Sequence, residues 1–246
     1  FYIFSVRPGT EPALRRLPGI EALEEAIEQA ATEDRPVLFV TGSEDLNDIG
    51  TIAGLGVLDQ VASRTASHDV ELLVPHLHSL VMTAAADTID QAYITAGKPG
   101  VNDRDANFYV SDEQFGFVAG VGGIMSREEP AACLYFGSFY AEALSLAEMG
   151  QTIGAKQIAG TNSSSQIPFL LAACDHVLIG EELYAAQAYL SRDPRQVGCL
   201  KGQDLGKALA VLAISVGCAL ATLATLSGSE NLNRLKDAWL ALFQSG

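Results

Sequence analysis

Short apolar runs alternate with amphipathic helical patterns along most of this chain, and the alternation restricts its fold more than any other feature. Residues 18–34 carry apolar side chains at helical spacing between acidic ones, which predicts a helix. The run after Pro36 is rich in β-branched residues and has no polar alternation, as expected for a parallel strand buried on both faces. Helical patterns separate the later runs as well. The six apolar runs are VLFVTG, VELLVP, ANFYV, AACLYFG, KQIAG and HVLIGE.

This order of elements predicts an α/β domain with a mostly parallel sheet over residues 7–205. A Rossmann-like sheet with helices on both faces fits better than an eight-stranded barrel, because the barrel needs more strand–helix units than the chain supplies. The sequence has no internal repeat and no low-complexity linker that would divide this region.

A second constraint is the stretch ALAVLAISVGCALATLATL, residues 208–226, which contains no charged residue. As a helix it is about 28 Å long, close to the roughly 30 Å of a bilayer's hydrocarbon core. We therefore predict a transmembrane helix over residues 206–227; an alanine-rich helix in a protein core is the alternative. Ala213, Gly217, Ala221 and Thr225 recur at every fourth position, a pattern that lets helices approach closely in lipid, so we expect a homo-oligomer.

The segments that flank these two regions suggest how the chain meets the bilayer. Residues 1–6, FYIFSV, are interpreted as the end of an N-terminal membrane segment, with a processed terminus or an edge strand as alternatives. Residues 228–246 form an amphipathic pattern suited to an interfacial helix or a partner contact. Basic residues lie on the domain side of both apolar segments, so the positive-inside rule places the domain in the cytoplasm. They are Arg7, Arg15, Arg16, Lys201 and Lys207.

The net charge limits the classes of partner that the chain can bind, and the cysteines indicate the compartment of the domain. The formal net charge of −15 argues against nucleic-acid binding, which depends on clustered Lys and Arg. Cys133, Cys174, Cys199 and Cys218 form no CxxC pair and no secreted-domain spacing, so we interpret them as small buried apolar residues of a cytoplasmic domain.

The stretch GTNSSSQIP, residues 160–168, is the most suggestive candidate site. It joins an expected strand to a helix predicted from about residue 164, and the carboxyl ends of parallel strands are where ligands bind in such sheets. Backbone N–H groups at a helix start can hold a small anion such as a phosphate or a carboxylate. Capping of the helix by Thr161 or Ser163 is the alternative. The candidate ligand-binding residues are Gly42, Ser43, Gly160, Thr161, Asn162, Ser163, Ser164 and Glu181.

Motifs that would identify a reaction are missing from the sequence. It contains no GxxxxGK[ST], no GxGxxG after a strand, no GxSxG and no HExxH, so no catalytic residue, cofactor or metal is assigned. His76, His78 and carboxylates such as Asp48 and Asp112 could bind a divalent ion, but their spacing in the sequence matches no known metal-binding motif.

Several segments together resemble a bacterial membrane-protein family known only as a domain of unknown function. They are RRLPGIEALEEAIEQA, RPVLFVTG, DEQFGFVAGVGGIM, IAGTNSSSQIPFLLAACDHVLIGEELYAAQAYLSRDP and LKGQDLGK followed by the apolar stretch. The resemblance extends to about residue 226 and implies a cytoplasmic α/β domain between an N-terminal membrane helix and one or more C-terminal ones. It implies no activity and no catalytic residue.

Two functions remain open at this point. The chain is either a membrane-anchored, self-associating structural or binding module, or a membrane-bound enzyme or sensor with a small anionic ligand at the strand carboxyl ends. The missing motifs favour the first and weigh against an enzyme. The state of the crevice at the strand ends, open or filled by the chain's own side chains, discriminates between them.

Overall fold

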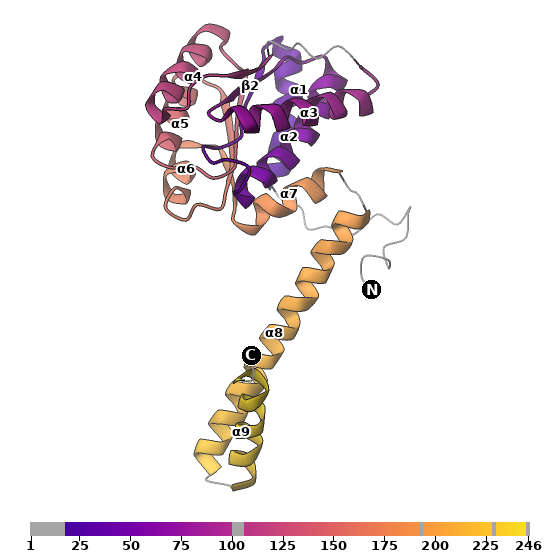
Figure 1. Ribbon diagram of the computed structural model, residues 1–246, viewed down its shortest axis with the longest axis vertical. Helices are drawn as coiled ribbons and strands as arrows, with labels where there is room; N and C mark the ends of the chain where they lie inside the picture. The colour runs from indigo at the N-terminus through magenta and orange to yellow at the C-terminus, as the bar shows by residue number, and fades with distance from the viewer. Residues whose placement is uncertain (1–17, 100–105, 192–193, 228–229, 245–246) are drawn as a thin grey trace. The chain divides into compact units, whose positions relative to one another are not determined.

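The computed structural model describes residues 18–99, 106–191, 194–227 and 230–244. The chain divides into two compact units, one formed by Ala13–Arg192 and the other containing Asp193–Gly246 (Figure 1). Each unit is treated by itself below. The membrane segment predicted over residues 1–6 lies outside the described residues.

The first unit is an alternation of helices and strands that follows the predicted order closely. Every predicted strand is present, and most helix boundaries lie within a few residues of those expected. Its elements are α1 (Pro18–Glu33), β1 (Val37–Val40), α2 (Ile49–His68), β2 (Leu72–His76), α3 (Ser79–Thr95), β3 (Asn107–Tyr109), α4 (Gln114–Glu128), β4 (Ala132–Phe136), α5 (Glu142–Thr152), β5 (Lys156–Thr161), α6 (Ile167–Ala173), β6 (His176–Ile179) and α7 (Glu181–Ser191).

The strands form one parallel sheet in the order β3-β2-β1-β4-β5-β6. This is the strand order of a doubly wound, Rossmann-type sheet, in which the chain changes direction across the sheet between β1 and β4. Helices α1, α2, α3 and α7 share one apolar core with the sheet, and α4, α5 and α6 share the other (Figure 1). The predicted α/β fold class is confirmed.

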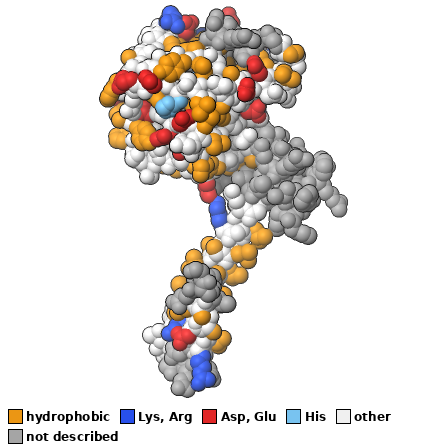
Figure 2. Space-filling view, in the orientation of Figure 1, with side chains coloured by type: hydrophobic (Ala, Val, Ile, Leu, Met, Phe, Trp, Pro, Cys, Tyr) orange, Lys and Arg blue, Asp and Glu red, His pale blue; other side chains and the backbone are white. Residues whose placement is uncertain are grey.

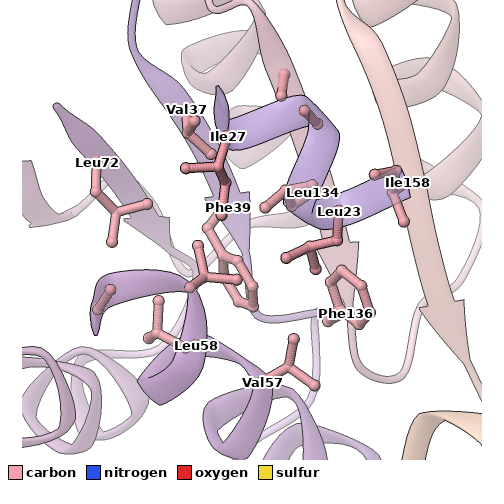
Figure 3. Close-up of a cluster of buried hydrophobic side chains, with 14 of the residues drawn as sticks. Leu23, Ile27, Val37, Phe39, Val57, Leu58, Leu72, Leu134, Phe136 and Ile158 are labelled. Carbon is pink, nitrogen blue, oxygen red and sulfur yellow. The ribbon is translucent and has the colours of Figure 1, made fainter. Parts of the chain in front are cut away.

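The surroundings of strand β1 explain why polar and apolar residues do not alternate in its sequence. Phe39 points into the core under α1 and α2, where its ring stacks on that of Phe136 with centroids 5.7 Å apart (Figure 3). Leu38 and Val40 point into the opposite core, under α4 and α5. All four residues of β1 are buried, so both faces of the strand must be apolar.

Helix α2 approaches the end of β4 so closely that one of its positions has no room for a side chain. A Cβ atom on Gly54 would overlap the backbone carbonyl oxygen of Phe136. Backbone atoms cannot rotate away as a flexible side chain can. Gly54 therefore fixes the start of α2 against the carboxyl end of β4, which is the point where the sheet changes direction.

The substitution Gly54→Ala should lower the free energy of unfolding by about 1–3 kcal/mol, because the added methyl group forces α2 away from β4. Gly123→Ala is the matched control. Gly123 is an exposed glycine inside α4 with no atom near its Cβ position, so alanine there should stabilise the fold by about 0.5–1 kcal/mol. Urea denaturation followed by circular dichroism measures both; equal effects of the two changes would contradict the proposed close contact.

The described residues of the second unit form two helices, α8 (Pro194–Ser227) and α9 (Glu230–Gln244). Within α8, the 25 residues Gly202–Leu226 are long and apolar enough to cross a membrane, and most of this stretch is exposed. Residues 194–205, which the sequence assigned to the α/β domain, belong to the same continuous helix. Helix α9 corresponds to the amphipathic segment predicted after the apolar stretch.

The small residues of α8 lie on the side that packs against α9. Ala224 is buried, while Ala213, Gly217 and Ala221 are half-buried on an otherwise exposed helix. A Cβ atom on Gly217 would lie 3.0 Å from the indole nitrogen of Trp239. Three of the four residues predicted to join two copies of the chain are therefore partly covered, Gly217 by Trp239, while Thr225 is exposed; self-association stays a prediction.

The contact between α8 and α9 can be tested with the single tryptophan of the chain. Gly217→Leu fills the space that Trp239 occupies, so the Trp239 fluorescence should become more accessible to acrylamide in mild detergent. Gly206→Leu changes the same helix at a position where a Cβ meets open space, and it should leave the quenching unchanged. If Gly217→Leu left the quenching at its original level, Trp239 would not lie against Gly217.

Candidate functional site

All strands are parallel, so their carboxyl ends and the starts of the following helices share one edge of the sheet. We call this surface the carboxyl edge. It comprises the segments that follow the strands (41–48, 77–78, 110–113, 137–141, 162–166 and 180) and the first two turns of the helices after them. Its centre is the point between β1 and β4 where ligands usually bind in doubly wound sheets.

Ser138, which follows β4, lies at this centre. Its hydroxyl oxygen is 2.6 Å from a carboxylate oxygen of Asp48 and 2.9 Å from the side-chain oxygen of Asn162. The Asn162 amide donates to the Tyr184 hydroxyl at 2.8 Å. Asp48 also accepts from the backbone N–H of Thr51 and so caps α2. Side chains from four segments of the chain therefore bond to one another at the centre.

A second group lies beside it and is centred on Glu142. This carboxylate is 3% exposed and accepts hydrogen bonds from the Ser43 hydroxyl, the Gln114 amide and the Tyr140 backbone N–H. Three donors around a buried acid satisfy its oxygens, as burial requires. The Tyr140 hydroxyl bonds to the carboxylate of Glu44, and this bond raises the pKa of Tyr140.

His76 forms a third, buried group at the end of β2. Its Nε2 lies 2.6 Å from the side-chain oxygen of Asn107, and its Nδ1 lies 3.3 Å from the Thr41 hydroxyl. The Asn107 amide nitrogen donates to the Met82 carbonyl, which assigns the oxygen of Asn107 to His76. The imidazole therefore carries its proton on Nε2. Burial lowers the pKa of His76 to about 4, although the hydrogen bond to Asn107 opposes this, so the ring is neutral at physiological pH.

The carboxyl edge also has a depression of about 280 Å³ at the ends of β2 and β3. Its lining is Leu77, His78, Ser79, Tyr109 and Asp112. His78 reaches from it to the backbone carbonyl of Ser43, with its Nε2 3.2 Å from that oxygen.

The structure places the predicted site residues in three kinds of environment. Gly42, Ser43 and Asn162 meet at the centre through Ser138; Gly42 has a φ of 87°, and its Cβ would lie 2.7 Å from the Ser138 carbonyl oxygen. Gly160 lies inside β5, where a Cβ would lie 2.6 Å from the Phe136 ring, so it serves packing. The other predicted residues are a buried Thr161, a half-buried Ser163, an exposed Ser164 and an exposed Glu181 in the first turn of α7.

Helix α6 starts at Ile167, three residues later than expected, and is seven residues long. The N–H groups from Thr161 to Ser165 therefore precede its first turn. That of Ser163 donates to the Thr161 hydroxyl at 3.1 Å. Gln166 occupies the cap position and makes no side-chain cap hydrogen bond, while the backbone carbonyl of Ser163 accepts from the N–H groups of Gln166 and Ile167. The binding of a small anion by the N–H groups from Thr161 to Ser165 stays a prediction.

Three residues of the carboxyl edge were missed in the sequence: Tyr140, Glu142 and Tyr184. Tyr140 and Glu142 directly follow the predicted strand AACLYFG, so their position after a strand end was a usable signal. Tyr184 had no such signal. Its contact with Asn162 exists because β5 pairs with β6 and places the start of α7 beside the end of β5.

Metal and thiol chemistry find little support among the described residues. No three His, Cys, Asp or Glu side chains of the described ranges come together as a metal-binding group. Burial raises the pKa of the thiols of Cys133 and Cys174 to about 12, so both stay protonated at neutral pH and are poor nucleophiles. Cys218 is exposed on α8, unlike the buried position expected from the sequence, and the side chain of Cys199 lies outside the described residues.

A family model described as a domain of unknown function (DUF6754) matches residues 1–232. This match agrees with the resemblance inferred from the sequence segments. The chain matches no curated protein and no solved structure.

The low pKa of His76 predicts a pH dependence of stability. Between pH 6.5 and 4 the unfolded chain binds more protons at this residue than the folded chain, so the free energy of unfolding falls as the pH is lowered through this range. The loss from His76 between pH 7 and pH 5 should be about 2 kcal/mol. Urea denaturation of His76→Gln should show this part of the pH dependence removed. His68→Gln, at an exposed histidine, should keep it; identical profiles of the two variants would contradict the assignment.

Proposed function

The chain belongs to the DUF6754 family, and from its structure we propose that it is a membrane-anchored binding module whose carboxyl edge meets a partner. One observation carries this proposal. The polar side chains at the centre of the carboxyl edge bond to one another, while large apolar side chains around them are exposed. A centre whose polar side chains already bond to one another, with apolar side chains exposed around it, suits contact with another molecule's surface better than enclosure of a substrate.

The charges at the centre weigh against a small anionic ligand, which the sequence had suggested. Glu44, Asp48 and Glu142 all place carboxylates there, and the Ser43 hydroxyl donates to Glu142. An anion would have to displace these hydrogen bonds and approach like charges. The enzyme or sensor hypothesis is therefore the weaker one for this geometry.

Helix α8 supplies the proposed anchor. Within Gly202–Leu226, the uncharged residues 208–226 extend about 28 Å as a helix, close to a hydrocarbon core of about 30 Å, and Lys207 lies on the domain side of them. Lys201 and Lys207 on the domain side, together with Arg7, Arg15 and Arg16, favour a cytoplasmic α/β unit. Self-association through the small residues of α8 is a weaker part of the proposal, because α9 must leave that face first.

Membrane anchoring and sidedness can be tested together. The double change Leu212→Arg and Val216→Arg puts two charges in the middle of the apolar stretch and should move the chain from the carbonate-washed membrane fraction to the soluble fraction. Ile94→Arg, at an exposed isoleucine of α3, is the control and should stay with the membrane. A chain that is soluble without either change would contradict the anchor.

The orientation is read from an exposed thiol introduced by Ser67→Cys at the end of α2. An impermeant maleimide should label it in broken cells and leave it unlabelled in intact ones. Labelling of intact cells would place the α/β unit outside.

A further inference from the structure

The exposed apolar side chains of the α/β unit are distributed very unevenly. Apart from Ile94, every large hydrophobic residue that is exposed in the described part of this unit belongs to the carboxyl edge or to a strand end that borders it. The amino ends of the strands have no comparable set among the described residues. On the face drawn in Figure 2, hydrophobic and acidic side chains adjoin one another. Six that represent the set are Ile49, Ile52, Leu80, Tyr109, Phe115 and Tyr140.

The basic side chains are segregated along the same axis, whereas acids occur at both ends. The described Lys and Arg side chains of the α/β unit lie before the strands, after the helices or near helix C-termini, which is the opposite end of the sheet; they are Arg35, Arg64, Lys98, Arg127 and Lys156. Each of them is paired with an acid there, namely Glu33, Glu24, Asp69, Glu128 and Glu25 in the same order. At the carboxyl edge the described charged side chains apart from histidine are all acidic, and include Glu44, Asp45, Asp48, Asp112 and Glu113.

Helix ends account for part of this segregation. Helices begin at the carboxyl edge, where partial positive charge favours acids, and Asp48 and Glu113 do cap α2 and α4. Capping does not explain the apolar residues between these acids, because helix starts favour acidic and polar side chains; apart from Ile94, the described remainder of the unit has no large apolar side chain in the exposed class. Ile49 and Ile52 on the first turn of α2 and Phe115 on α4 each leave more than half of their surface exposed.

We propose that the carboxyl edge docks a basic, amphipathic segment of another protein, with apolar side chains between Lys or Arg residues. This inference rests on the proposed function and adds the chemistry of the partner. The isoleucines, leucine and tyrosines of the edge cover the partner's apolar side chains, and the carboxylates pair with its cations. Six strands at about 4.8 Å spacing make the edge about 24 Å wide, the length of a helix of about sixteen residues.

Two other occupants fit less well. A second copy of the unit would bring either its own acidic edge or its opposite end, where the described basic side chains are already neutralised by acids. An anionic membrane surface would repel the carboxylates that surround the apolar residues. A basic protein segment complements both the charge and the apolar surface.

The test uses the full chain in nanodiscs of uncharged lipid and a phage-displayed library of random sixteen-residue peptides. Selection on empty nanodiscs first removes lipid binders. Enriched peptides should carry net positive charge and apolar residues, and their affinity should fall with added salt. Ile52→Ser should weaken the affinity of an enriched peptide by about tenfold. Ile94→Ser is the matched control, because both isoleucines are 54% exposed and Ile94 lies at the other end of the unit.

The charge of the partner is tested separately with Asp112→Lys, which should weaken peptide binding. Glu28→Lys on α1 is the control and should leave peptide binding unchanged. Peptides that are neutral or acidic but depend on Ile52 would overturn the partner's chemistry and leave the docking face standing. Peptides that bind independently of Ile52, or an absence of enrichment, would overturn the docking face and with it the proposed function. Empty nanodiscs that contain anionic lipid are also tested for binding to the chain. If they bind and the Ile52→Ser change abolishes this binding, the partner of the carboxyl edge is a membrane and not a protein.

Discussion

The close approach of α2 to the carboxyl end of β4 is the constraint on which the rest of the α/β unit depends. Gly54 brings α2 against the Phe136 carbonyl, and a Cβ on Gly50 would overlap the Ser138 hydroxyl. At the same place the loop after β1 contacts the loop after β4. Gly42, which has a φ of 87°, packs against the backbone of Ser138. A sheet that changes direction here usually leaves a crevice, and at this place these contacts bring the side chains of Asp48, Ser138 and Asn162 together.

The same architecture explains the polarity of the unit. A parallel sheet gathers helix starts at one edge, and helix starts favour acids as caps. The basic side chains consequently lie at the other end, where each described one pairs with an acid. The apolar residues of the carboxyl edge are the part of this surface that the architecture does not require, which is why they indicate contact with another molecule.

The elements of the fold could be predicted well because each has a local signal. The buried run VLFV and the amphipathic pattern of residues 18–34 each carry their own periodicity, and β1 and α1 formed where expected. The site could be predicted only in part. Gly42, Ser43 and Asn162, chosen by their position after strands, come together through Ser138, whereas Gly160 packs against Phe136; their part in binding a ligand stays a prediction. The start of α6 was placed too early, because a run of hydroxyl residues is compatible with both a turn and a helix cap.

The sequence by itself determined the class of the α/β unit and the length of the apolar stretch, since periodicity and the absence of charge act over neighbouring residues. It also identified the small-residue face of α8. Only the tertiary structure decided what those residues meet. Trp239 lies against Gly217 because α9 folds back on α8, and Tyr184 meets Asn162 because β5 and β6 are neighbours in the sheet. Partners far apart in the chain are chosen by packing, in which many weak contacts compete, and no local pattern records the outcome.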